Sequence, residues 1–158
     1  MTVHSAGLLL YRMRPTLEVL IAHMGGPFWA RKDEGAWSIP KGEFDPAEET
    51  ATDAAAREFL EELGVAPPPG PFAELGTFPY SSGKRVTVFV ADGATLDLSA
   101  VQFGEFEMEW PPRSGRTASF PEVDRVDWVT PERARELLVK GQRPALDALE
   151  RALAATES

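Results

Sequence analysis

The sequence predicts an α/β fold in which helices flank a mixed β-sheet. Short apolar runs typical of strands recur along the chain between turn signals, an amphipathic helix pattern lies among them, and helix patterns end the chain. The 158 residues are 43% hydrophobic and 26% charged, which is ordinary for one compact core. We therefore expect a single domain over residues 1–158.

The first part of the chain predicts a hairpin and a short strand. Apolar runs at about residues 3–11 and 18–23 flank a turn signal at Arg14-Pro15-Thr16. A loop that contains glycine and proline follows. Residues 37–40 (Trp-Ser-Ile-Pro) then predict a short strand just before Gly42.

A helix is predicted over residues 51–63 from its own start and stop signals. Thr50 and Asp53 match the spacing of a capping box, and three consecutive alanines at 54–56 are strong helix formers. Gly64 stands where a left-handed C-terminal stop is expected.

The remaining elements follow from alternation and helix-start signals. The predicted strands lie at about residues 72–79, 85–91, 103–110 and 123–129, with residues 111–122 as a loop. Thr130, with Pro131 at the first helical position, opens one helix. Pro144 starts the last helix.

The predicted helix at 51–63 has one face crowded with acids. At about 100° per residue, Glu62 lies near 40° and Glu61 near 300° from Glu58, whereas the opposite face is apolar. Like charges at this spacing destabilise a helix by a few tenths of a kcal/mol, roughly. We therefore expect a positive partner, for which a hard divalent cation such as Mg²⁺ is the natural candidate.

These residues resemble the signature of the Nudix hydrolases. From Arg57 to Val65 the sequence R-E-F-L-E-E-L-G-V matches the second half of the family's box, which spans residues 42–65 here. The first half is one residue longer than the pattern. Glu49 keeps the spacing to Arg57, while Glu48 keeps the spacing to Gly42. Because loops absorb insertions cheaply, we assign the first glutamate to Glu49, with Glu48 as the alternative.

The resemblance implies a Nudix-type α/β/α sandwich and a hydrolase that needs Mg²⁺ or Mn²⁺. By carry-over, Glu58 and Glu62 are the expected metal ligands, joined by Glu61 and by the backbone carbonyl of Lys41. Arg57 is expected to pair with Glu49 and tie the loop to the helix. The catalytic set that the resemblance implies is Glu58, Arg57 and Glu49.

The implied reaction is cleavage of a diphosphate linkage in a nucleoside diphosphate derivative. A Nudix-fold module that binds a nucleotide without turnover is the alternative, although a pure binder has no reason to keep a repulsive cluster of acids. The net charge of −9 argues against nucleic acid as a partner. The chain contains no cysteine, which excludes thiolate chemistry. Its first apolar run is too short for a membrane span, so we expect a cytoplasmic protein. We expect this protein to be a monomer or a homodimer.

Several further residues are weaker candidates. Family members often recruit an acid from outside the box, and Glu105, Glu107 or Glu109 could supply it, unless these three form only a solvated strand face. His23 is expected to be structural rather than a base. Four aromatic residues could stack on a nucleobase: Phe28, Trp29, Trp37 and Trp110. Of these, Trp29 is the one that we expect to be exposed. Arg31 and Lys32 could meet phosphates or simply be solvated.

Overall fold

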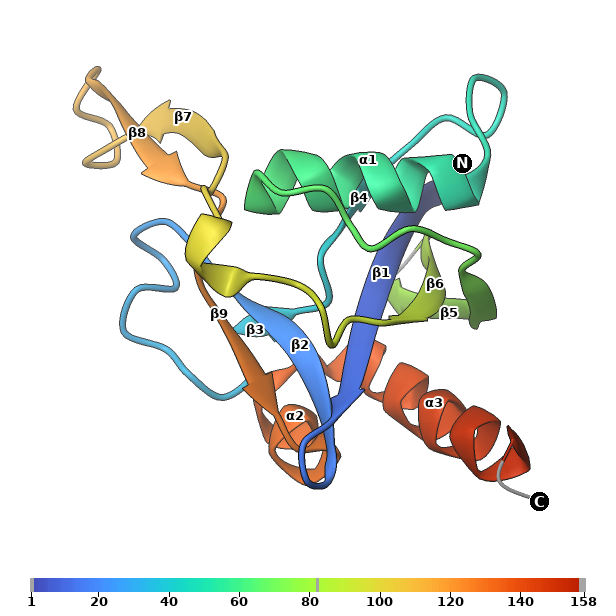
Figure 1. Cartoon of the computed structure of the whole chain (residues 1–158). Helices are drawn as coiled ribbons and strands as arrows, with labels where there is room; N and C mark the ends of the chain where they lie inside the picture. The colour runs from blue at the N-terminus through green and yellow to red at the C-terminus, as the bar shows by residue number, and fades with distance from the viewer. Residues whose placement is uncertain (1, 82, 157–158) are drawn as a thin grey trace.

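A seven-stranded mixed sheet forms the middle layer of the molecule (Figure 1). The computed structural model describes residues 2–81 and 83–156. The strands of this sheet are β1 (Val3–Met13), β2 (Leu17–Met24), β3 (Trp37–Ser38), β4 (Lys41–Glu43), β5 (Ala73–Ser81), β6 (Lys84–Asp92) and β9 (Val123–Val129). β1 and β6 pair in parallel, and the other pairings are antiparallel. The predicted mixed sheet is therefore confirmed.

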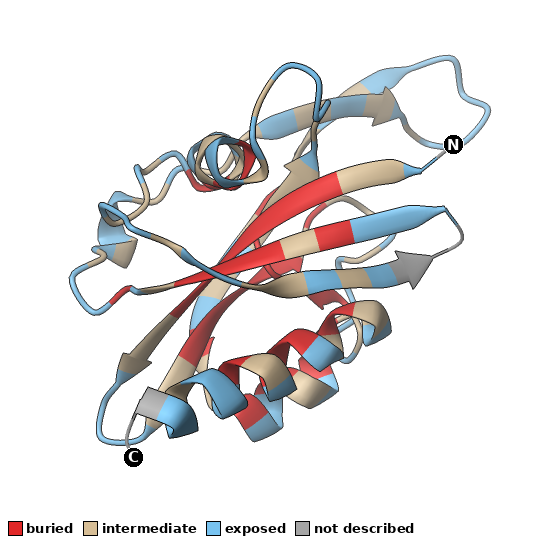
Figure 2. Cartoon of the chain, turned by 90° about the vertical axis from the view of Figure 1, so that its right-hand side faces the viewer, coloured by how far each residue is buried: buried red, intermediate tan, exposed pale blue. Residues whose placement is uncertain are grey.

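Helices cover both faces of this sheet, so the predicted α/β/α sandwich is also confirmed. α1 (Ala51–Leu63) lies on one face, and α2 (Pro131–Leu137) and α3 (Arg143–Thr156) lie on the other (Figures 1 and 2). Each face has its own apolar core. Phe59 and Leu63 belong to the core under α1, whereas Leu146 and Leu149 belong to the opposite one. Two short 3₁₀ turns, η1 (Leu98–Ala100) and η2 (Lys140–Gln142), complete the fold.

The helix α1 begins and ends at the predicted residues because both ends are set locally. The Thr50 hydroxyl accepts a hydrogen bond from the Asp53 backbone N–H at 3.1 Å, a cap that contributes about 1 kcal/mol. Gly64 takes the left-handed conformation with φ of 69°, and its N–H donates to the Leu60 carbonyl. Phe59 is fully buried and adds about 2–3 kcal/mol of hydrophobic stabilisation.

The strand predicted at residues 37–40 is shorter than expected, because the chain changes partners there. β3 pairs with β2, whereas β4 pairs with β1. Ile39 and Pro40 make the step between the two strands. Pro40 has no N–H to donate, but its carbonyl accepts from Leu8 at 3.1 Å. This step brings β4 beneath α1.

The prediction of a loop over residues 111–122 was wrong for residues 117–121 and holds for residues 111–116 and 122. Thr117–Pro121 form strand β8, which pairs with β7 (Glu105–Glu109) in a separate two-stranded hairpin that projects from the body (Figure 1). The hairpin is closed by a hydrogen bond from the Trp110 N–H to the Arg116 carbonyl at 2.9 Å. β8 has five residues and depends on this pairing, so its own sequence carries little strand signal.

Within the described residues, none of the helices has the length and apolar character needed to cross a membrane.

Candidate active site

Arg57 gathers three glutamates around its guanidinium group. Its Nη2 donates to Glu49 at 2.5 Å, and its Nε bonds both oxygens of that carboxylate at 3.1 and 3.2 Å. Its Nη1 donates to Glu58 at 2.9 Å and to Glu61 at 3.2 Å. The hydrogen bond from Arg57 lowers the pKa of Glu49, and the same bond raises the pKa of Arg57. The guanidinium thus ties the loop before α1 to the acidic face of the helix.

The loop before α1 contains a tight turn at Asp45. The backbone N–H groups of Glu48 and Glu49 both donate to the Asp45 carbonyl, and the Asp45 side chain accepts from Ala47 at 2.9 Å. A turn of this kind accommodates the extra residue of the box without disturbing the helix. Of Glu48 and Glu49, the residue whose carboxylate bonds Arg57 is Glu49.

Glu62 is an acid partly withdrawn from water among other acids. Its pKa is raised to about 8, first by burial and then by the nearby charges of Glu58 and Glu122, against the opposing effect of Lys41. The pKa of Glu58, whose side chain is 14% exposed, is also raised, first by burial. Removal from water is therefore the first cause that disfavours the charged form of both side chains, and neighbouring acids add to it.

The strand β4 places two backbone features against these acids. A Cβ atom at Gly42 would lie 2.0 Å from the carboxyl carbon of Glu58, so the absence of a side chain makes room for that acid. The Lys41 backbone N–H donates to the Glu62 carboxylate.

The hydrogen-bond alternation of β4 also fixes the direction of the Lys41 carbonyl. Pro40 and Phe44 bond across to Leu8 and His4 of β1. Because bonded and non-bonded pairs alternate in an antiparallel ladder, Lys41 opposite Gly7 is a non-bonded pair. Both its N–H and its carbonyl therefore point away from β1, on the side where the N–H meets Glu62.

The residues brought together by α1 and β4 fit a divalent cation in their chemistry. Carboxylates and a backbone carbonyl are oxygen donors, which Mg²⁺ and Mn²⁺ prefer, and burial together with the neighbouring acids raises the pKa of Glu62. Across the described residues, no group of three or more His, Asp or Glu side chains is spaced to hold a metal ion. Arg57 is bonded instead to two of the predicted ligands, Glu58 and Glu61.

Glu122 is an acid at this site that the sequence analysis missed. It precedes β9, and its N–H donates to the Gly104 carbonyl at 2.7 Å, while the Gly104 N–H donates to the backbone carbonyl of Glu62 near the end of α1 at 3.2 Å. A Cβ atom at Gly104 would lie 3.6 Å from the Glu122 carboxylate and 2.6 Å from the Glu61 carbonyl. The pKa of Glu122 is raised by burial and by Glu61. Contacts between distant backbone segments bring it there, so no sequence spacing signals it.

The three acids predicted from the alternation of residues 103–110 lie on the exposed face of β7. Glu105 accepts a hydrogen bond from Ser119 on the neighbouring strand at 3.2 Å. Glu109 accepts from the Arg113 N–H in the hairpin turn at 2.7 Å. Both bonds lie within the hairpin and stabilise it. A role for Glu105, Glu107 or Glu109 in the reaction stays a prediction.

His23 is fully buried and bonded at both ring nitrogens. Its Nδ1 lies 2.7 Å from Asp124, and its Nε2 lies 2.6 Å from the Lys32 carbonyl. The ring also packs edge-on against Trp37. This arrangement fits the expected structural role, because it ties the loop that contains Lys32 to the sheet.

The aromatic candidates divide between the core and the surface. Trp37 is buried, and Trp29 is partly buried against the core rather than fully exposed. Phe28 is 58% exposed and packs edge-on against Trp110, which lies just after β7. Arg31 and Lys32 are exposed, and Lys32 lies over the Trp29 ring at 5.4 Å.

A cavity of about 470 Å³ adjoins β4 and carries positive charge. Three lysines line it, and Lys41 joins it to the strand beside Glu62. Its lining consists of Met24, Trp29, Ser38, Lys41, Lys84, Val139, Lys140, Gly141 and Gln142. Positive side chains around an apolar tryptophan wall suit an anionic ligand that also has an aromatic group.

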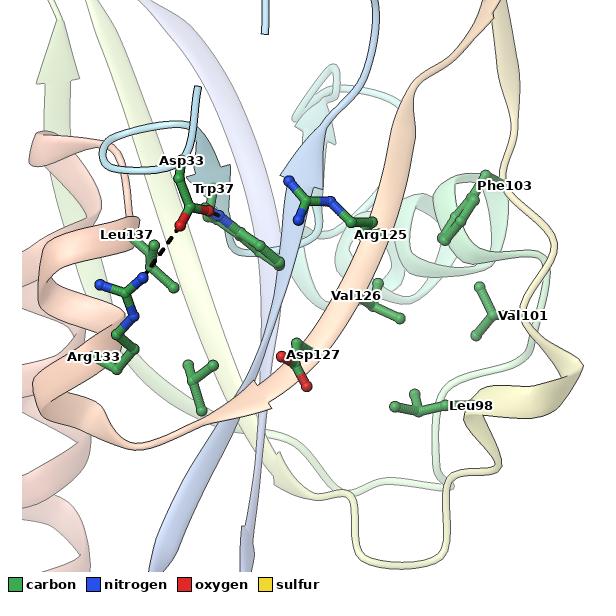
Figure 3. A pocket seen from close by; sticks show the side chains of 11 residues that line it. Asp33, Trp37, Leu98, Val101, Phe103, Arg125, Val126, Asp127, Arg133 and Leu137 are labelled. Carbon is green, nitrogen blue, oxygen red and sulfur yellow. Dashed lines mark hydrogen bonds and ion pairs between the residues drawn. The ribbon is translucent and has the colours of Figure 1, made fainter. Parts of the chain in front are cut away.

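A larger cavity of about 540 Å³ lies along β9, and its lining includes Trp37 but none of the predicted metal ligands or catalytic residues (Figure 3). Three of its four charged side chains, those of Asp33, Arg125 and Arg133, already have partners. Asp33 accepts from Arg133 at 3.2 Å and from the Trp37 indole at 2.8 Å, and Arg125 lies over the Trp37 ring at 5.3 Å. We therefore place the candidate chemistry at the cavity beside β4.

The sequence matches a known domain over nearly its whole length. The model of the NUDIX domain covers residues 1–149. A segment of 54 residues is 44% identical to an uncharacterised 17.7 kDa protein of Enterobacteria phage T4, and 56 residues are 41% identical to the RNA pyrophosphohydrolase of Alkalilimnicola ehrlichii. Each alignment covers 34% of this chain, and 36% and 30% of the two relatives. The matched segments thus span about a third of the curated relatives.

Solved structures with the same architecture cover almost the entire chain. The Ap4A hydrolase of C. elegans in a binary complex has a TM-score of 0.69 at 23% identity, over 96% of this chain and 98% of that one. The NUDIX domain of Shewanella oneidensis NrtR, bound to ADP ribose, has a TM-score of 0.65 at 16% identity, over 97% and 89%. At these identities the likeness concerns the fold.

Proposed function

The chain belongs to the Nudix family, and from this we propose that it is a metal-dependent hydrolase that cleaves the diphosphate linkage of a nucleoside diphosphate derivative. One observation carries the proposal: Glu58, Glu62 and the backbone of Lys41 converge beside a lysine-lined cavity. Two matched proteins carry names that denote cleavage of phosphoanhydrides, the RNA pyrophosphohydrolase and the Ap4A hydrolase. Those names support the reaction class and leave the substrate of this chain open.

In the proposed reaction the metal ligands are Glu58, Glu61, Glu62 and the Lys41 carbonyl. When bound, Mg²⁺ or Mn²⁺ supplies charge neutralisation at the phosphate oxygens and lowers the pKa of a coordinated water. Glu122, which lies near Glu61, is the acid outside α1 that would accept a proton from the attacking water.

The remaining residues of the proposed site bind and orient. Lys84 and Lys140 draw the phosphates into the cavity, since two cations beside a carboxylate cluster offset its repulsion of an anionic substrate. Trp29 provides an apolar wall for a base or sugar. Arg57 keeps the box loop and α1 together through Glu49.

A screen of nucleoside diphosphate derivatives tests this proposal. The purified protein is incubated with each compound and Mg²⁺ or Mn²⁺, and released phosphate and pyrophosphate are measured beside Glu58→Gln and a no-metal control. We expect turnover of at least one compound that requires both the metal and Glu58. Tight nucleotide binding without turnover of any compound would instead indicate a binding module.

A further inference from the structure

The buried amide of Gln142 is bonded to the segment that leads into the candidate site. Gln142 is 1% exposed and belongs to η2, more than a hundred residues away from that segment. Its Oε1 accepts from the Ile39 backbone N–H at 2.7 Å. Its Nε2 donates to the Ser38 hydroxyl at 2.9 Å. The Ser38 hydroxyl in turn donates to the Ile39 carbonyl at 2.8 Å.

The chemistry of these groups allows one direction for each bond. A backbone N–H can only donate, so the amide oxygen of Gln142 must face Ile39. The amide nitrogen then faces Ser38, whose hydroxyl accepts that bond and has its own proton left for the Ile39 carbonyl. The three bonds form a closed ring that holds both backbone groups of Ile39 through one side chain from another part of the chain.

The held segment is the step between β3 and β4. From Ile39 the chain passes through Pro40, which is bonded to Leu8, and then reaches Lys41 and Gly42. Those two residues set the backbone against Glu62 and Glu58. Ile39 lies two residues before Lys41, whose carbonyl is the predicted ligand, so a displacement of Ile39 would be passed along the backbone to that carbonyl. β4 has only three residues to oppose such a displacement.

We propose that Gln142 is a positioning residue of the metal site, which fixes Ile39 so that the Lys41 carbonyl and Gly42 keep their place beside Glu62 and Glu58. Residues that orient metal ligands from outside typically change metal affinity by 10–100-fold when replaced, roughly. The inference rests on the proposed function for its effect on turnover, whereas metal affinity can be measured without any substrate.

The test compares Mn²⁺ dissociation constants of the wild type and of variants by electron paramagnetic resonance. Gln142→Met keeps the length of the side chain and removes every hydrogen bond, so we expect Mn²⁺ affinity to fall about tenfold and kcat to fall with it. Gln142→Glu keeps an oxygen for the Ile39 N–H but cannot donate to Ser38, so we expect a smaller fall in affinity than in Gln142→Met. Leu149→Ala is the matched control, because Leu149 is fully buried beside Val90 and Tyr11 and its loss destabilises the fold elsewhere.

The possible results distinguish a failure of the inference about Gln142 from a failure of the proposed function. Wild-type Mn²⁺ affinity in a folded Gln142→Met protein overturns the inference, as does an equal loss in Leu149→Ala. Should Gln142→Met fail to fold, Ser38→Ala removes the bonds to Gln142 and to the Ile39 carbonyl but spares the Ile39 N–H bond, so a smaller loss of affinity is expected, and an unchanged affinity there overturns the inference. A wild type that binds Mn²⁺ but turns over no diphosphate contradicts the proposed function alone.

Discussion

At the scale of single residues, the site depends on the missing side chain of Gly42. The space that a Cβ would take is occupied by the Glu58 carboxyl group at 2.0 Å. The three nearest atoms all belong to the end of the Glu58 side chain, so a methyl group here would first displace the tip of a flexible side chain rather than the backbone.

We therefore predict that Gly42→Ala lowers turnover strongly while the melting temperature changes little. The double variant Gly42→Ala with Glu58→Gln should be no less active than Glu58→Gln alone, because both changes act on one carboxylate. The measurement is kcat/KM together with thermal unfolding for the three variants. Additive losses would mean that Gly42 acts on something other than Glu58.

Glu58→Gln removes one charge with almost no change of shape. Turnover should fall by orders of magnitude, because the proposed metal loses a ligand. The metal-free protein should melt at the same or a higher temperature, since Glu58 is repelled by Glu61 and Glu122. Steady-state kinetics with Mg²⁺ and a thermal scan in chelator measure both. A variant with wild-type turnover would remove Glu58 from the mechanism.

At the scale of elements, Arg57 connects the turn at Asp45 to α1. It does so through a two-point contact with Glu49, a geometry that the planar guanidinium provides and a lysine cannot. The loop and the helix are separate elements whose relative position depends on this pair, and Arg57 is 38% exposed, so the coupling is of modest strength.

Arg57→Ala should lower both stability and turnover, and Arg57→Lys should recover only part of either. A double-mutant cycle with Glu49→Gln should give a coupling energy of about 0.5 kcal/mol or more, whereas the cycle with Glu48→Gln should give none. Chemical denaturation of the single and double variants provides the values. Coupling to Glu48 alone would show that the extra residue of the box lies after the first glutamate.

The hairpin β7–β8 and the segment before β9 offer competing acids for the reaction. Glu122 lies near Glu61, whereas Glu105 and Glu109 bond within the hairpin. We predict that Glu122→Gln costs about 100-fold in turnover, the usual scale for a general base, while the same change at Glu105, Glu107 and Glu109 costs little. Single-turnover rates of the four variants, measured at a saturating metal concentration, rank their effects. A large loss confined to one hairpin acid would move the base to β7.

At the scale of the whole molecule, two apolar cores on opposite faces of the sheet allow α1 to carry a repulsive acidic face. Part of the stability that these cores provide offsets the cost of Glu62, whose carboxylate is partly removed from water next to Glu58 and Glu122. Removal of that charge should stabilise the metal-free protein.

Glu62→Gln is therefore expected to raise the melting temperature in chelator and to abolish the rise that Mg²⁺ produces in the wild type. A ligand at 100 times its dissociation constant stabilises a fold by about 2.7 kcal/mol, which a thermal scan resolves. Glu132→Gln, in an exposed position on α2, serves as the control. An equal Mg²⁺ effect in both variants would exclude Glu62 as a ligand.

Features with local causes were predictable from the sequence, and features with distant causes were not. Helix α1 was found in full because Thr50 and Gly64 set its ends and its two faces are opposed. Strand β8 was missed because it is stable only against β7. Glu122 reaches the site through a backbone bond to Gly104. No pattern within a short window of sequence could report such a contact.

The bonds from Arg57 to Glu58 and Glu61 mean that these carboxylates already have a cation of their own. An incoming metal ion must exchange with this resident charge, so its net affinity is a difference between two interactions and is lower than the number of carboxylates suggests. When the metal ion leaves, these two carboxylates can bond Arg57 again. A chain that has just been synthesised can fold with its acids compensated by Arg57, and it can then load or lose a metal ion according to the free concentration around it.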